Sequence, residues 1–185
     1  ILHAGFNYLK PTAEQLPPTT KPIDKMIGAD ISFLPELEDK GLVFTENGKP
    51  IDPVILLKNH GFNYIRLRVF VNPENENGYS PGKDYCGLEK TLALAKRVHE
   101  AGFKILLDFH YSDTRADPQK QFKPKAWEGL DFATLTDSVT SYTIRVMNAF
   151  KNQGTAPQMV QVGNEINHGM IWPDGHISNP DQLAQ

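Results

Sequence analysis

The side chains best suited to chemistry follow one another at the end of an apolar run, as the amide Asn164 and the carboxyl group Glu165. The run before them, from Met159 to Gly163, has the character of a buried strand. Such polar groups are costly to leave unpaired in a dry core, but at the end of a strand they can face a cleft. In a blander interpretation, Asn164 caps the next segment and Glu165 is a solvated loop residue. The other strand ends help to decide between the two.

Three other apolar runs also carry polar residues at their ends. The first ends in Asp30, the second carries Arg66 and Arg68, and the third ends in His110 with Asp113 beyond it. One polar strand end is a loop boundary, but four in succession predict a shared pocket. In that pocket a carboxylic acid such as Glu165 could protonate the departing oxygen of a glycosidic bond, while a second carboxylate attacks the anomeric carbon.

Neighbouring side chains in this predicted pocket suit the binding of a sugar. An amide such as Asn164 can hydrogen-bond a sugar hydroxyl, and Arg68 can hold a carboxylate ionised and oriented. Trp127 and Trp172 offer faces on which sugar rings could stack, and a place in the core or in an interface suits each of them equally well. The pattern favours a glycan-binding cleft with hydrolytic chemistry.

The histidines and carboxylates do not form a recognisable metal motif. Glu165 and His168 have the Glu-x-x-His spacing of di-iron bundles, but that centre needs paired motifs on helices, and Glu165 follows a strand. His110, His168 and His176 lack the spacing of a zinc or calcium site. The single cysteine, Cys86, cannot form an internal disulfide. We predict that this chain uses no metal and no other cofactor.

The composition is that of an ordinary globular chain, and it argues against two classes of partner. The 185 residues are 39% hydrophobic and 22% charged, which permits a sizeable core in one domain. The 19 Lys and Arg residues nearly balance the 22 Asp and Glu residues, so no electrostatic footprint for nucleic acid or anionic lipid is visible. No run of about 18 apolar residues is present to span a membrane. A neutral partner fits better.

Strands and helices are predicted to alternate along most of the chain. We expect strands at 26–31, 63–71, 103–110 and 159–163, and helices at 52–61, 88–102 and 132–149. Residues 1–25 contain four prolines and show no sustained period, so we expect a leader that packs on the barrel predicted below. The segment from Ser32 to Pro50 is expected to be a long irregular loop.

This alternation argues for a parallel sheet with crossover helices. The helix-to-strand links at Gly61, Gly102 and Gly154 are tight, whereas the strand-to-helix loops from Asn72 and Tyr111 are long and polar. The long loops would therefore lie on the carboxyl face of a barrel. A nucleotide-binding doubly wound sheet would need a Gly-rich turn after its first strand, which is absent. We predict the α/β class and a (β/α)8 TIM barrel of about 250 residues, of which residues 26–185 supply about the first four β/α units.

Four motifs in order carry a family resemblance. They are Gly28-Ala29-Asp30-Ile31-Ser32; Ile65-Arg66-Leu67-Arg68-Val69 running into Val71-Asn72-Pro73; Leu107-Asp108-Phe109-His110-Tyr111-Ser112-Asp113; and Val162-Gly163-Asn164-Glu165 with Trp172-Pro173 beyond. Together they resemble glycoside hydrolase family 53, the arabinogalactan endo-β-1,4-galactanases, over about residues 26–172. The resemblance implies a retaining endo-β-1,4-galactanase that acts on the β-1,4-galactan of type I arabinogalactan in pectin. It covers only the first half of a family barrel.

The resemblance also implies roles for individual residues. Glu165 would be the acid/base, and Asn164 would contact the hydroxyl next to the reacting carbon. Arg68 and His110 would support the nucleophile, a Glu on the seventh strand of family members that lies outside this sequence. Asp30, Asp113 and Trp172 complete the predicted substrate-binding set. A calcium site known in some bacterial members belongs to later loops.

One departure and two alternatives remain open. Arg115 stands where family members usually have Trp, so the resemblance implies a lost or altered stacking platform. The chain could instead belong to a related retaining barrel hydrolase acting on another β-glycan, such as β-mannan or β-glucan, or to a glycan-binding protein that has lost catalysis.

Four β/α units by themselves are expected to be inactive and poorly soluble. The last strand would present an unpaired edge and the acid/base would lack its partner carboxylate. The C-terminal half of the barrel is therefore an expected partner, beside the polysaccharide itself. A polymeric substrate implies a secreted, periplasmic or cell-surface location.

Overall fold

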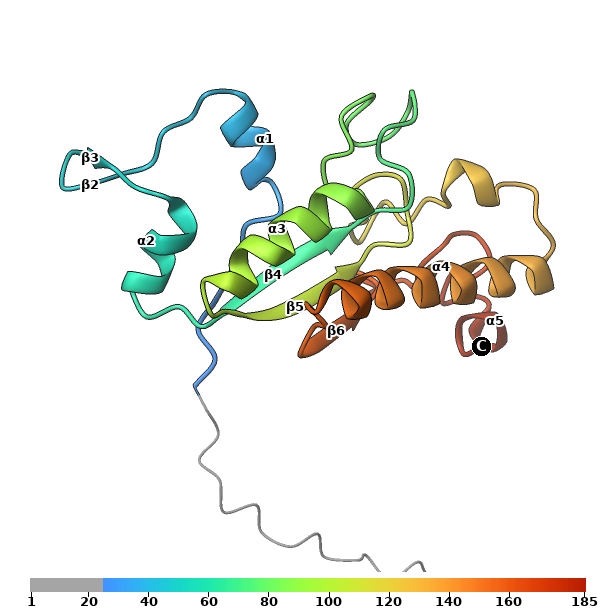
Figure 1. Ribbon diagram of the computed structural model, residues 1–185. Coiled ribbons are helices and arrows are strands. Elements are labelled where there is room, and N and C mark those ends of the chain that lie inside the picture. The colour runs from blue at the N-terminus through green and yellow to red at the C-terminus, as the bar shows by residue number, and fades with distance from the viewer. Residues whose placement is uncertain (1–24) are drawn as a thin grey trace, which may run out of the picture.

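A parallel four-stranded sheet is the centre of the computed structural model, which describes residues 25–185 (Figure 1). The strand order is β1-β4-β5-β6, so each strand of this sheet lies beside the previous one. The elements are β1 Gly28–Asp30, α1 Leu34–Asp39, β2 Thr45–Glu46, β3 Lys49–Pro50, α2 Pro53–Asn59, β4 Tyr64–Val69, α3 Leu88–Glu100, β5 Lys104–Phe109, the 3-10 helix η1 Lys125–Trp127, α4 Phe132–Gln153, β6 Met159–Val162 and α5 Pro180–Leu183. Apart from Lys25, the predicted leader lies outside the described residues, so its packing stays a prediction.

The sheet has two chemically different faces because successive side chains of a strand alternate. On β4, Ile65, Leu67 and Val69 are fully buried in the hydrophobic core, whereas the arginines between them belong to the opposite face. In the parallel register Arg68 lies opposite Asp108 of β5, so this aspartate shares the arginine face. We call the face that carries Arg66, Arg68 and Asp108 the inner face.

Helices α3 and α4 lie along the outer face of the sheet (Figure 1). Val98 of α3 and Val146 and Phe150 of α4 are fully buried and share one core with the apolar strand residues. Each fully buried side chain of this size contributes roughly 1.5–3 kcal/mol. Alternation along the strands therefore drives the apolar side chains under the helices and leaves the charged ones on the inner face.

The tight links predicted from sequence are confirmed. Gly61, Gly102 and Gly154 all have positive φ, at 83°, 77° and 81°, which a glycine adopts without strain after a helix. At the start of α2 the Asp52 carboxylate accepts a hydrogen bond from the Val54 amide at 2.7 Å, as expected of an N-cap. These short connections lie at the amino ends of the strands, and the long loops lie at the opposite, carboxyl ends.

The segment between β1 and α2 differs from the prediction of an irregular loop. It contains α1 and a two-stranded antiparallel hairpin, β2 and β3, joined through Asn47 and Gly48 with φ of 51° and 75°. Asn-Gly with both φ values positive is a favoured hairpin turn. The strands are too short for their alternation to be recognised, which is why sequence periodicity missed them.

The edge strands of the sheet, β1 and β6, each have one unpaired side among the described residues. Strand β6 has one neighbour, β5, and its Met159, Val160 and Val162 are 41%, 42% and 57% exposed. Apolar residues on an unpaired edge are a liability that closure into a barrel removes. Between residues 25 and 185 no helix has the length and apolar character to cross a bilayer.

Candidate active site

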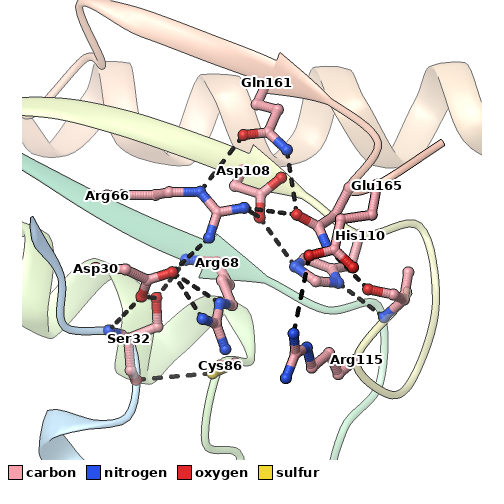
Figure 2. Close-up of polar contacts among 12 residues, drawn as sticks. Asp30, Ser32, Arg66, Arg68, Cys86, Asp108, His110, Arg115, Gln161 and Glu165 are labelled. Carbon is pink, nitrogen blue, oxygen red and sulfur yellow. Dashed lines mark hydrogen bonds and ion pairs between the residues drawn. The ribbon is translucent and has the colours of Figure 1, made fainter. Parts of the chain in front are cut away.

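A network of paired charges covers the inner face at the carboxyl ends of the strands (Figure 2). Arg66 of β4 binds the carboxylates of Asp30 on β1 and Asp108 on β5, with 2.5 Å from its Nη2 to Asp108 Oδ2. Arg68 Nη2 lies 2.8 Å from Asp30 Oδ2. Two guanidinium groups thus face two carboxylates, so the charges of this cluster cancel. Asp108 is fully buried, and such a carboxylate is tolerated only with a close cationic partner.

The Asp30 carboxylate is also bound by Ser32, which follows the end of β1. The Ser32 hydroxyl donates to Asp30 Oδ1 at 2.6 Å, and the same hydroxyl oxygen accepts from the Arg68 amide at 2.8 Å. Burial by itself would raise the pKa of the Asp30 carboxyl, but the hydrogen bonds from Ser32 and the charges of Arg68 and Arg66 outweigh it and lower the pKa. Asp30 is therefore a fixed anion that holds both arginines in place.

The network fixes the amide of Asn164, which is buried. Its Oδ1 accepts from Arg66 Nη2 at 2.7 Å, and its Nδ2 donates to the carbonyl of Ala116 at 2.8 Å. Arginine is a donor only, so the amide oxygen must face Arg66 and the orientation of the group is determined. One N–H of Nδ2 remains for another acceptor.

Glu165 follows at a sharp turn of the backbone. Gly163 has φ of 79° and Glu165 itself has φ of 52°, a left-handed conformation uncommon for residues other than glycine. A Cβ built on Gly163 would lie 2.7 Å from Ile166 Cγ2, so this position has no room for a side chain. The turn leaves the Glu165 side chain 42% exposed, with Arg115 Nη2 3.8 Å from its Oε1. An exposed carboxyl group thus stands directly beside a buried, immobilised amide.

His110 lies beneath this pair and is almost completely buried. Its Nδ1 accepts from the Ala116 amide at 2.9 Å, which places the proton of a neutral imidazole on Nε2. Nε2 lies 2.9 Å from Asp108 Oδ2 but outside hydrogen-bond alignment. Among the described residues, His110 Nε2 and Asp108 Oδ1 therefore have no aligned partner. Buried polar atoms of this kind call for a partner beyond these residues.

The structure brings together five of the seven predicted site residues on the inner face and its loops: Asp30, Arg68, His110, Asn164 and Glu165. Trp172 lies nearby, because its amide donates to the Gln121 carbonyl at 2.7 Å and the Gln121 side chain donates to the Asn164 carbonyl at 2.7 Å. Its indole is partly exposed. Trp172 thus borders the loop that carries the acid/base candidate.

Asp113 has a different set of contacts. Its carboxylate accepts from the Asn72 amide at 2.9 Å, from Asn75 Nδ2 at 2.7 Å and from the Lys125 amide at 2.8 Å. These bonds tie the loop after β4 to the loop after β5, and no described contact joins Asp113 to Glu165. Trp127, for which stacking and core places were equally suitable, is 6% exposed and packs edge-on against Tyr142. It is a core residue.

Asp108 and Gln161 belong to the site although they were not chosen as site residues from the sequence, and Arg66, expected at a strand end of the pocket, had been given no role. Gln161 of β6 accepts from Arg66 Nε at 3.4 Å. The available signal was the strand alternation that puts Asp108 on the same face as His110, two residues later. No group of three or more His, Cys, Asp and Glu side chains within residues 25–185 is arranged to hold a metal ion.

Known proteins similar to this chain are found both by sequence and by structure. Residues 26–185 match the model of glycosyl hydrolase family 53. The chain is 42% identical over 159 residues to arabinogalactan endo-beta-1,4-galactanase A of Aspergillus niger, covering 85% of this chain and 43% of that protein. A family 53 catalytic domain of Ignisphaera aggregans superposes with a TM-score of 0.81 at 40% identity, over 91% of this chain and 47% of that one.

A structure from work on two fungal beta-1,4-galactanases matches with a TM-score of 0.77 at 35% identity, over 85% of this chain and 45% of that one. The chain thus spans about half the length of the relatives it matches. The parallel sheet with its outer helices and the two superpositions confirm the predicted fold, the first four β/α units of a (β/α)8 barrel. Sequence and fold therefore lead to one assignment: the chain belongs to glycosyl hydrolase family 53.

Proposed function

We propose that this chain, completed by a second half-barrel, forms an endo-β-1,4-galactanase that hydrolyses the β-1,4-galactan of type I arabinogalactan with retention of configuration. The names of its relatives support this substrate class. The observation that carries the proposal is the placement of Glu165 at the carboxyl end of β6, beside an Asn164 amide fixed by Arg66 and Ala116. Active sites of (β/α)8 barrels lie at that end of the strands.

In the proposed reaction Glu165 acts as general acid and then as general base. It donates its proton to the glycosidic oxygen as the bond between that oxygen and the anomeric carbon breaks. A carboxylate of the second half-barrel attacks the anomeric carbon and forms a glycosyl-enzyme intermediate. Glu165 then takes a proton from the water that hydrolyses this intermediate. The exposure of Glu165 leaves it accessible to a polymer.

The surrounding residues are assigned to positioning and binding. The free N–H of Asn164 Nδ2 can donate to a sugar hydroxyl, because its oxygen is already occupied by Arg66. His110 Nε2 is a buried donor without an aligned partner, which suits a hydrogen bond to the nucleophile. Arg68 and Asp30 hold the inner face rigid around it.

Two further predicted residues act at the rim of the pocket. Trp172 offers a partly exposed ring on which a sugar can stack. Asp113 contributes by fixing the two loops that border the site. A polymeric pectin substrate further suggests action outside the cytoplasm, in a secreted, periplasmic or cell-surface enzyme.

The test uses the complete barrel and compares two substrates whose leaving groups differ in their need for acid. Glu165→Gln should lower kcat/KM on β-1,4-galactan by about 10²–10⁴-fold. On a dinitrophenyl β-galactobioside, whose leaving group needs no proton, the first step should keep most of its rate. Glu100→Gln, at the exposed end of α3, is the matched control and should leave both rates unchanged.

Each alternative predicts a different result. Preferred cleavage of a β-mannan or β-glucan would assign the chain to a related hydrolase. Binding of galactan without new reducing ends would indicate a glycan-binding protein. An equal loss on both substrates in Glu165→Gln would exclude the acid role of this residue. Retention is checked separately, since the first product observed by NMR should be the β-anomer.

A further inference from the structure

Arg115 is a cation at the entrance of the site, and among the described residues its guanidinium donors are unused. Its guanidinium points toward Glu165, with 3.8 Å between Nη2 and Oε1 (Figure 2). Its side chain is 56% exposed, and it makes no hydrogen bond to any residue between 25 and 185. Arg66, in contrast, is bound to two carboxylates and an amide. Arg115 thus differs from the arginines that hold the inner face together.

The backbone that carries Arg115 is fixed by the site itself. The next residue, Ala116, is fully buried, donates its amide proton to His110 Nδ1 at 2.9 Å and accepts from Asn164 Nδ2 at 2.8 Å. The Gln121 side chain donates to the Asp117 carbonyl at 3.1 Å. The backbone that follows Arg115 is therefore held by hydrogen bonds at the Ala116 amide and at the Ala116 and Asp117 carbonyls, so the position of the Arg115 guanidinium depends on its side-chain rotamers.

The contact between Arg115 and Glu165 is weak enough to be exchanged. At 3.8 Å it is longer than the 2.7–2.9 Å of a charge-assisted hydrogen bond, and both side chains are about half exposed. Exposed pairs of this kind shift an equilibrium by about fivefold at most. Nearby cations are better occupied, since Lys123 binds Asp174 and Lys125 Nζ lies 2.8 Å from Glu128 Oε2. Arg115 is therefore a cation that lies beside Glu165 and is available to a ligand.

We propose that Arg115 is a specificity-determining residue that accepts a carboxylate-bearing sugar, a uronic acid unit, next to the bond that is cleaved. A planar guanidinium matches a carboxylate with two parallel hydrogen bonds, which a neutral hydroxyl cannot provide. Without Arg115, a sugar carboxylate here would face the second catalytic carboxylate that hydrolysis requires, with no guanidinium to bind it. The inference rests on the proposed function, because Glu165 defines the position of the cleaved bond.

The experiment uses the complete barrel and two probes, β-1,4-galactotetraose and the same tetraose with one C6 hydroxymethyl group oxidised to a carboxylate. We expect Arg115→Ala to lower kcat/KM for the acidic tetraose about three- to fivefold more than for the neutral one. Arg115→Lys should retain part of the preference, because lysine keeps the positive charge but cannot form the two parallel hydrogen bonds of a guanidinium. The preference of the unchanged enzyme for the acidic tetraose should decrease when NaCl is raised from about 50 to about 300 mM, since salt screens an exposed interaction.

Arg145→Ala is the matched control, because it removes an equally charged exposed side chain that lies over the Tyr142 ring on α4. It should leave the ratio of the two kcat/KM values within twofold. The proposal is overturned if Arg115→Ala leaves that ratio unchanged, or if Arg145→Ala alters it as much.

Binding separates this proposal from the proposed function. If the unchanged enzyme cleaves neither tetraose, the galactanase assignment fails, and calorimetry on Glu165→Gln decides the role of Arg115. Tighter binding of the acidic tetraose, lost in Glu165→Gln/Arg115→Ala, supports the acidic subsite. Equal binding of both tetraoses to Glu165→Gln contradicts it.

Discussion

Removing Arg66 is the perturbation that should affect the inner face most strongly. Arg66→Met keeps much of the apolar stem but deletes the guanidinium that binds Asp30, Asp108 and Asn164. Asp30 retains Arg68 and Ser32 as partners. Asp108 retains no aligned partner, because it is fully buried and the neighbouring His110 Nε2 is out of hydrogen-bond alignment. The substitution therefore leaves one buried carboxylate without compensation.

The cost follows from that burial. Breaking a buried ion pair by removing one partner costs about 3–5 kcal/mol. For a barrel with a urea m-value of about 3 kcal/mol/M, the midpoint of unfolding should fall by about 1–2 M. Adding Asp108→Asn removes the stranded charge, so the double variant should recover about 1–3 kcal/mol relative to Arg66→Met.

The assay is urea unfolding of the complete barrel, followed by tryptophan fluorescence and circular dichroism. Arg97→Met is the control, since Arg97 also binds two carboxylates, Glu38 and Asp52, each at 2.9 Å, but on the surface. It should cost no more than about 1 kcal/mol. Equal midpoints for Arg66→Met and Arg97→Met would refute the view that the inner-face network is a buried, interdependent unit.

Three further predictions concern the strand ends and the core. Ser32→Ala removes a hydrogen bond that lowers the pKa of Asp30; the stabilisation from this depressed pKa is present above the unfolded value of 3.8 and is lost as pH falls through the folded value, so acid unfolding of the variant should begin at higher pH in a titration followed by circular dichroism. Gly163→Ala places a Cβ against Ile166 at positive φ and should reduce kcat/KM on galactan by about 10²-fold through displacement of Asn164 and Glu165, and an unchanged kcat/KM would contradict the strained-turn argument. Burial raises the pKa of the Cys86 thiol to about 12, so iodoacetamide at pH 8 should modify it only in unfolded protein, as mass spectrometry can show.

The parts of the fold that sequence could predict are those with long, regular patterns. Strands β4 and β5 and helices α3 and α4 each provide enough residues for a period to be recognised. The tight links at Gly61, Gly102 and Gly154 were equally predictable, because a glycine can end a helix in a left-handed conformation without strain. The hairpin β2–β3 was not, because two-residue strands carry no period.

Within the candidate site, sequence identified which residues lie at strand ends but not how they pair. Arg68 was expected to act on the nucleophile, while the larger share of the observed network belongs to Arg66. Asp113 was grouped with the pocket because it follows His110, yet its bonds depend on where the loops containing Asn72 and Lys125 fold back. Such partners are far apart in sequence, and only the folded loops bring them together.

The most direct test of the central claim is the distance from the Glu165 carboxyl to the nearest carboxylate of the second half in a crystal structure of the complete barrel. A retaining acid/base and nucleophile pair requires about 5–5.5 Å, and this is the value we predict. A separation of about 6.5–9.5 Å would indicate inversion instead. The absence of any Asp or Glu carboxylate of the second half within about 10 Å of the Glu165 carboxyl would contradict the assignment of Glu165 as a catalytic residue.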